Sequence, residues 1–201
     1  MKKFEEILSV LSHNDPALAN VINLIKPVYI KKKDDEFTSL IKIIIGQQLS
    51  GTAAKTIINR VKNALEEKVF TPKKILNINH EDLRSCGMSN AKIHYVKGFA
   101  EILIANPCYF FNLKKNTEEN VLIELCKIKG VGIWTASIFA MSSLNYENIF
   151  AYGDVSLNKA IKIIYKENLS QEDIISNWSP YKSFACRVLW QWVDKGMPNL
   201  S

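Results

Sequence analysis

Residues that commonly bind metals or form disulfides are sparse in this chain of 201 residues, which has four cysteines and three histidines. No two cysteines have the Cys-x-x-Cys spacing, so the pattern predicts neither a zinc site nor an iron–sulfur cluster. We therefore expect reduced, buried thiols, as in a cytosolic protein, at Cys86, Cys108, Cys126 and Cys186.

Long apolar runs are missing as well. Residues 1–6 are charged and lack an apolar core of signal-peptide length, and no segment is long enough to span a bilayer. The chain also lacks internal repeats and the alternation of apolar and polar residues that is typical of strands. These absences argue against a secreted, membrane or β-rich protein.

The charge balance is basic, with 26 Lys and Arg against 20 Asp and Glu, a formal net charge of +6. Such an excess suits a polyanionic partner, of which nucleic acid is the commonest. A basic surface that is merely solvated has the same composition, so the charge alone leaves both interpretations open.

What the chain does contain is helical periodicity. Between residues 36 and 50 one face collects Phe37, Leu40, Ile41, Ile44 and Gln48, widened by Ile43 and Ile45. Capping side chains recur at helix-length intervals, at Asp15, Thr71, Ser89, Thr117, Ser170 and Ser179. The charged run at residues 31–36 is expected to be a solvated linker turn. The pattern predicts an all-α protein of roughly ten helices.

One segment, residues 117–141, reads as a helix, a tight glycine turn and a second helix. Gly130 can adopt a positive φ, and a residue without Cβ lets another group approach closely. The turn is expected to leave the N–H groups of Val131, Gly132 and Ile133 at a helix N-terminus, where they can bind a phosphate. A tight corner between helices explains the glycines equally well.

Asp154 follows Gly153 and opens a helix with an apolar face. An aspartate there is by default an N-cap, although a capping aspartate at the edge of a cleft can also present one carboxylate oxygen to a substrate. Tryptophans stand at four positions, Trp134, Trp178, Trp190 and Trp192. Such residues are usually core, but a pocket for a flipped base needs the same side chains.

Taken together, the glycine turn, the Gly-Asp pair and the tail "WSPYKSFACRVLW" resemble the helix-hairpin-helix DNA glycosylase superfamily. Within it, the chain is most similar to the 3-methyladenine DNA glycosylase II branch, which removes alkylated bases. The stretches "IIIGQQLSGTAAKTIINRV" (43–61) and "LRSCGMSNAKIHYVKGFAEIL" (83–103) match as well. With "HNDPALANVI" the likeness spans residues 13 to 194.

The resemblance implies a two-lobed all-α fold with the active-site cleft between the lobes. Residues 36–130 would form the central lobe and residues 131–201 the second lobe, against which the N-terminal helices in residues 1–35 would pack. It also implies a monofunctional enzyme that flips 3-methyladenine or 7-methylguanine out of double-stranded DNA and hydrolyses the N-glycosidic bond in base excision repair. We expect a monomer that is cytoplasmic and associated with the nucleoid.

Residue by residue, the resemblance assigns Asp154 as the catalytic carboxylate and Trp134, Trp190 and Tyr152 as substrate-binding aromatics. Its implied DNA contacts at the hairpin are Lys129, Gly130, Val131, Gly132 and Ile133. It also implies a wedge, which fills the space that the flipped base leaves in the DNA, at Met88, Ser89 and Asn90. No cofactor would be required, but a structural Na⁺ or K⁺ could be held by the backbone carbonyls of Cys126, Ile128 and Val131. Gln47 and Gln48 match the family without an assigned role, and packing at a helix end explains them equally well.

Two differences from related enzymes argue against cutting of the DNA strand. Relatives that also cut the strand have a Schiff-base lysine where this chain has Trp134, and they often carry a four-cysteine cluster that is missing here. Two alternatives remain: a non-catalytic helix-hairpin-helix DNA-binding module, which Asp154 argues against, and a strand-cutting glycosylase for oxidised bases, which Trp134 argues against.

Overall fold

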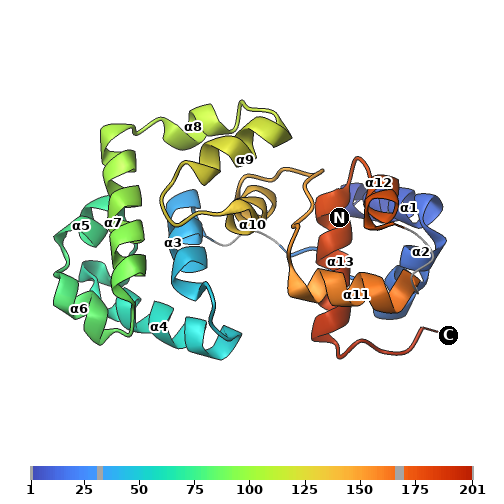
Figure 1. Cartoon of the computed structure of the whole chain (residues 1–201), viewed down its shortest axis with the longest axis horizontal. Coiled ribbons are helices and arrows are strands. Elements are labelled where there is room, and N and C mark those ends of the chain that lie inside the picture. Colours follow the sequence, from blue (N-terminus) through green and yellow to red (C-terminus); the bar gives the residue numbers. More distant parts are fainter. Residues whose placement is uncertain (1, 31–33, 166–169, 201) are drawn as a thin grey trace. The chain divides into compact units, whose positions relative to one another are not determined.

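The computed structural model describes residues 2–30, 34–165 and 170–200 (Figure 1). Within these ranges every regular element is helical, with thirteen α-helices and one short 3₁₀-helix. The prediction of an all-α protein is therefore confirmed. The estimate of ten helices was low because several helices have only five or six residues, too short for a recognisable apolar period.

The helices form two compact units, one made of Met1–Lys32 and Asn145–Ser201 and the other of Lys33–Leu144. Unit 1 contains α1 (Lys2–Asn14), α2 (Pro16–Ile25), α11 (Val155–Tyr165), α12 (Gln171–Asn177) and α13 (Lys182–Asp194). Unit 2 contains α3 (Glu36–Gly46), α4 (Gly51–Ala64), η1 (Glu66–Lys68), α5 (Pro72–Asn77), α6 (His80–Ser85), α7 (Asn90–Ala105), α8 (Tyr109–Leu113), α9 (Glu118–Cys126) and α10 (Ile133–Ser143).

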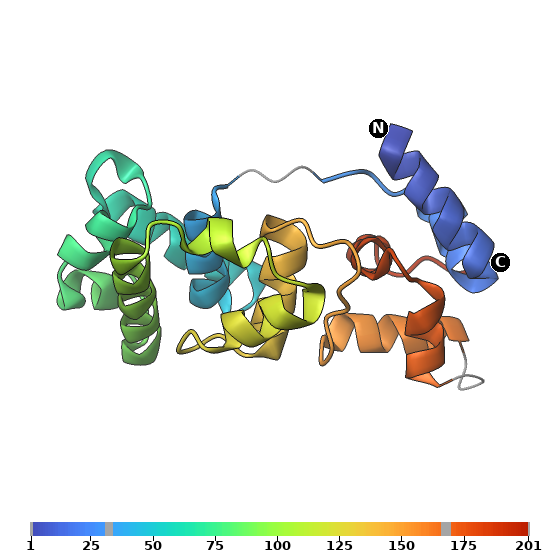
Figure 2. The ribbon, with the colours of Figure 1, turned by 90° about the horizontal axis from the view of Figure 1, so that it is seen from above.

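The division between the units differs from the boundary after residue 130 that the sequence suggests. Helix α10 belongs to unit 2, because it packs against α9 and α3. In unit 1, α2 packs against both α13 and α11, so the N-terminal helices and the C-terminal segment share one core. Figure 2 shows the two sets of helices from a second direction.

Helix α3 forms the centre of unit 2, in contact with α4, α7 and α10. The predicted apolar face is confirmed, since Phe37, Leu40, Ile41 and Ile44 are all buried. Gln48 does not belong to that face, because α3 ends at Gly46 and Gln48 is exposed with a φ of 58°.

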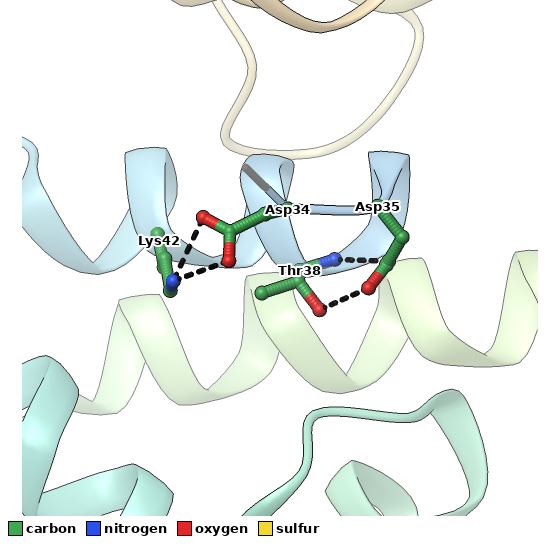
Figure 3. A network of polar contacts seen from close by, with 4 residues as sticks. All are labelled: Asp34, Asp35, Thr38 and Lys42. Atoms are coloured by element: carbon green, nitrogen blue, oxygen red, sulfur yellow. Dashed lines mark hydrogen bonds and ion pairs between the residues drawn. The ribbon is translucent and has the colours of Figure 1, made fainter. Parts of the chain in front are cut away.

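The start of α3 adds a helix cap to the predicted solvated turn, in which Asp35 is exposed. The Asp35 carboxylate accepts hydrogen bonds from the Thr38 backbone N–H at 2.8 Å and from the Thr38 hydroxyl at 2.7 Å (Figure 3). Asp34 accepts two from Lys42 Nζ, at 2.7 and 2.8 Å. An N-cap of this kind contributes about 1 kcal/mol. Residues 31–33 of the predicted linker lie outside the described ranges.

The other predicted caps are confirmed with one exception. Side chains cap α2, α5, α7, α9 and α12 from Asp15, Thr71, Ser89, Thr117 and Ser170. Ser179 does not cap α13, because that helix begins only at Lys182, after Tyr181.

A buried polar cluster joins the helices of unit 1. Asp15 is 3% exposed, and its Oδ1 accepts from the Leu18 N–H at 2.9 Å. Its Oδ2 accepts from Trp178 Nε1 at 2.7 Å and from the Tyr165 hydroxyl. Burial, followed by this contact with Asp15, raises the pKa of Tyr165 above its usual range. Tyr165 therefore remains a neutral donor, and the cluster ties α2 to the end of α11 and to the residue after α12.

Candidate active site

Asp154 lies in unit 1 at the start of α11. Gly153 before it has a φ of 81°, and the Asp154 N–H donates to the Ala151 carbonyl at 3.2 Å, which closes a tight turn. The carboxylate Oδ1 accepts the Leu157 N–H at 2.9 Å in the first turn of the helix. The default interpretation of Asp154 as an N-cap is thus confirmed. The residue is 9% exposed, so it is largely buried.

Trp190 of α13 reaches the same carboxylate. Its Nε1 donates to Asp154 Oδ1 at 3.2 Å, and its side chain is half-buried. The resemblance nominates Trp190 for its ring face alone. The hydrogen bond is a contact that spacing along the sequence could not reveal, because 36 residues separate the two side chains.

The remaining aromatic candidates divide between core and surface. Trp178 and Trp192 are 0% and 1% exposed and belong to the core of unit 1. Tyr152 is 49% exposed, with its ring edge-on to Phe150 at a centroid distance of 4.9 Å. Trp134 is 37% exposed and belongs to unit 2. The structure brings Trp190 to Asp154, whereas a pocket that also includes Trp134 stays a prediction.

The hairpin turn between α9 and α10 is built around Gly130. This residue has a φ of 86°, and a Cβ added to it would lie 2.2 Å from the Tyr95 ring. The glycine is therefore required both by the left-handed backbone and by the close approach of an aromatic ring. The turn is closed by the Val131 N–H, which donates to the Ile128 carbonyl at 3.0 Å.

Gln47, which had no assigned role, holds this turn from the end of α3. Its Nε2 donates to the Gly130 carbonyl at 2.9 Å and to the Thr135 hydroxyl at 3.0 Å, one contact on each side of the turn. Lys92 of α7 in turn donates from Nζ to the carbonyls of Ile45 and Gln47, at 2.8 and 2.6 Å. Burial lowers the pKa of Lys92. A polar residue directly after a buried helix is the one signal in the sequence for this role.

The N-terminus of α10 matches the expected anion site only in part. Its N-cap is Gly132, which has no side chain to cap the helix. The first helical hydrogen bond is donated by the Ala136 N–H to the Gly132 carbonyl. The N–H groups of Gly132 and Ile133 thus lack a helical acceptor, and both residues are exposed. Val131 was wrongly included, because its N–H is used within the turn.

Lys129 stays a predicted DNA contact. It is exposed on the turn, and its Nζ lies 3.3 Å from His94 Nε2 of α7.

A pocket of about 500 Å³ lies beside the hairpin within unit 2, lined in part by Gln48, Lys92 and Tyr95. Its wall also contains the residues nominated for a monovalent cation, Cys126, Ile128 and Val131. Backbone carbonyls are the hard oxygen ligands that Na⁺ and K⁺ require. The Ile128 carbonyl retains a second lone pair beyond the one that accepts the Val131 N–H. In the described residues, no three His, Cys, Asp or Glu side chains are grouped to hold a metal ion.

The three predicted wedge residues differ in exposure. Met88 is 1% exposed and its carbonyl accepts from Arg84 Nη1 at 2.6 Å, so in this structure its side chain is packed in the core, and its contact with DNA stays a prediction. Ser89 caps α7, and the exposed Asn90 lies 3.1 Å from His80 Nε2. Ser89 and Asn90 stay predicted contacts.

The expectation of buried thiols holds at only two positions, since Cys86 and Cys186 are buried but Cys108 and Cys126 are exposed. Burial raises the pKa of Cys186 to about 12. Of the helices that the structure describes, none combines the length and the apolar character needed to cross a membrane.

Comparisons of the sequence and of the structure with known proteins all find DNA repair proteins. The family model of the HhH-GPD superfamily of base excision DNA repair proteins matches residues 41–177. DNA-3-methyladenine glycosylase 1 of Schizosaccharomyces pombe is 29% identical over 171 residues, which cover 83% of this chain and 74% of that protein. The crystal structure of the DNA-3-methyladenine glycosidase from Bacillus halodurans has a TM-score of 0.81 and 29% identity, over 92% of this chain and 88% of that chain. The S. pombe 3-methyladenine DNA glycosylase in complex with abasic DNA has the same TM-score at 23% identity, over 94% and 97% of the two chains, and supports the fold.

Proposed function

Because the chain belongs to the HhH-GPD superfamily of base excision DNA repair proteins, we propose that it is a 3-methyladenine-type DNA glycosylase that excises alkylated purines. The observation that carries this proposal is the Asp154 carboxylate, which is held at a helix N-terminus by the Leu157 N–H and the Trp190 indole. Curated relatives of the same type match most of the chain, and they support the choice of substrate.

In the proposed reaction, the bond between C1′ of the deoxyribose and the purine nitrogen breaks, and its electron pair leaves with the base. A 3-methyladenine or 7-methylguanine carries a formal positive charge, so it departs neutral and needs no proton. The positive charge moves to the sugar, where the Asp154 carboxylate stabilises it, as in glycoside hydrolysis. The same carboxylate orients a water, whose oxygen bonds to C1′ and whose proton is released.

DNA binding in this proposal rests on the hairpin. The N–H groups of Gly132 and Ile133 would donate to a phosphate, with the exposed Lys129 nearby. The net charge of +6 supports the same partner. A Na⁺ or K⁺ bound by the carbonyls of Cys126, Ile128 and Val131 would add positive charge to the turn. We propose that the protein acts as a monomer.

The function is tested by incubating the protein with methylated duplex DNA and separating the released bases by chromatography. Release of 3-methyladenine and 7-methylguanine is expected. Tight binding of the same DNA without release of any base would instead identify a DNA-binding module that has lost its chemistry.

The product is expected to be an intact abasic site, because Trp134 occupies the position at which strand-cutting relatives have their lysine. The strand should break only after alkali is added. Borohydride added during the reaction should trap no covalent complex of protein and DNA on a denaturing gel. A trapped complex would favour the strand-cutting alternative.

The enzyme is also expected to excise cationic methylpurines faster than hypoxanthine. The ring faces of Trp190 and Tyr152, both in unit 1, would hold a cationic ring by contacts that reach about 2 kcal/mol, which corresponds to roughly 30-fold selectivity. Rates measured on duplexes with one lesion each test this, and Trp190→Ala should narrow the difference. Equal or faster release of hypoxanthine by the wild type would show that the pocket does not select for charge.

A further inference from the structure

Two indole–carboxylate pairs occur in unit 1, and they differ in their surroundings. Trp178 Nε1 donates to Asp15 at 2.7 Å, and Trp190 Nε1 donates to Asp154 at 3.2 Å. Each aspartate also accepts the N–H three residues further on, in the first turn of a helix. The chemistry is the same, but only the second aspartate is the proposed catalytic group.

We propose that Trp190 is a positioning residue for glycosidic bond hydrolysis, in which the indole N–H fixes the orientation of the Asp154 carboxylate. This inference rests on the proposed function and assigns the indole nitrogen a role distinct from base stacking.

A helix cap alone does not fix a carboxylate completely. The Leu157 N–H holds Oδ1, but the torsion of the aspartate carboxyl group is broad, so one backbone donor does not fix its orientation. The Trp190 N–H reaches the same oxygen from α13. These two donors come from two helices and hold the same oxygen, so together they restrict rotation of the carboxylate more than the cap does by itself.

Trp190 is itself held firmly. The next residue, Gln191, accepts the Val28 N–H at 2.9 Å and donates to the Val28 carbonyl at 3.1 Å. Leu189, before Trp190, and Trp192, after Gln191, are 0% and 1% exposed. The backbone that carries the indole is thus anchored on both sides, as a positioning group requires.

The surroundings of the two pairs indicate their different roles. Asp15 also accepts from the Tyr165 hydroxyl, and its partner Trp178 is fully buried, so that pair is enclosed in the core. Trp190 is only half-buried, and Asp154 is 9% exposed against 3% for Asp15. The first pair therefore serves as a matched structural control for the second.

The test compares Trp190→Phe with wild type in single-turnover excision of 7-methylguanine. Phenylalanine keeps an aromatic face but removes the N–H, so the rate should fall about 10- to 100-fold. The affinity for duplex DNA with an abasic-site analogue should change less than about twofold. The residual rate of Asp154→Asn, measured over long incubations, should not fall further when Trp190→Phe is added, because Trp190 acts through the carboxylate.

Trp178→Phe provides the control, since it should lower Tm while the rate per folded enzyme stays at the wild-type value. In ¹H–¹⁵N spectra of the full chain, Asp154→Ala should shift the Trp190 indole resonance and leave that of Trp178 in place. This measurement applies even if Trp190→Phe folds poorly.

A wild-type rate in Trp190→Phe, an independent further loss in the Asp154→Asn background, or an unshifted Trp190 indole would overturn the positioning role. Wild-type protein that releases no methylated base would instead refute the proposed function itself, and with it the role built on it.

Discussion

Asp154→Asn is expected to abolish the release of methylated bases while the affinity for abasic-site DNA stays close to that of the wild type. The carboxylate acts on positive charge that develops on the sugar only in the transition state, and a neutral amide cannot stabilise that charge. We expect a loss of at least about 1000-fold in the single-turnover rate. Binding is measured separately by titration of a labelled duplex with an abasic-site analogue.

The structure indicates that this substitution removes the charge without removing the helix cap. Asparagine caps helices about as well as aspartate does, and its side-chain oxygen can still accept from the Leu157 N–H and the Trp190 indole. Tm should therefore change little, whereas Asp154→Ala should cost about 1 kcal/mol because the cap is removed. A folded Asp154→Asn protein that releases bases at the wild-type rate would disprove the catalytic assignment.

Gly132→Asp should change stability and DNA binding in opposite directions. The backbone of Gly132 has a φ of −89° and a ψ of 175°, which any residue can adopt, and an added Cβ would contact nothing within 4 Å. An aspartate would supply the side-chain cap that α10 lacks and stabilise the protein by about 0.5 kcal/mol. At the same position its charge would repel a phosphate bound by the hairpin.

The affinity for all duplex DNA should therefore fall by about 10- to 100-fold, equally with and without a lesion. The log–log salt slope should decrease by about 0.9 for each phosphate that the hairpin no longer binds. Gly132→Ala is the control, since it adds no charge and should bind nearly as the wild type does. If the aspartate variant keeps both its affinity and its salt slope, the hairpin glycines serve packing and not phosphate binding.

Local rules predicted most of the helix starts and the core. Caps such as Asp15 and Thr117, and the buried face of α3, depend on residues within one or two turns of each other, so the sequence contains the whole signal. The N-cap role of Asp154 was predictable for the same reason.

Contacts between distant residues were not predictable in this way. The bonds from Gln47 to the hairpin span more than eighty residues, and the Trp190–Asp154 bond depends on how α13 packs against α11. The burial of Met88 was not predictable for a related reason. It stands in a polar-looking loop, and only the fold shows that its side chain turns inward.

Gly130 and Tyr95 also constrain how this sequence can change in evolution. The tyrosine can become smaller by itself and leave only a void, whereas the glycine cannot gain a side chain unless residue 95 first becomes smaller. Even then, the φ of 86° at residue 130 disfavours every other residue. Position 95 can therefore vary while position 130 stays glycine, and a side chain at position 130 is compatible only with a smaller residue at position 95.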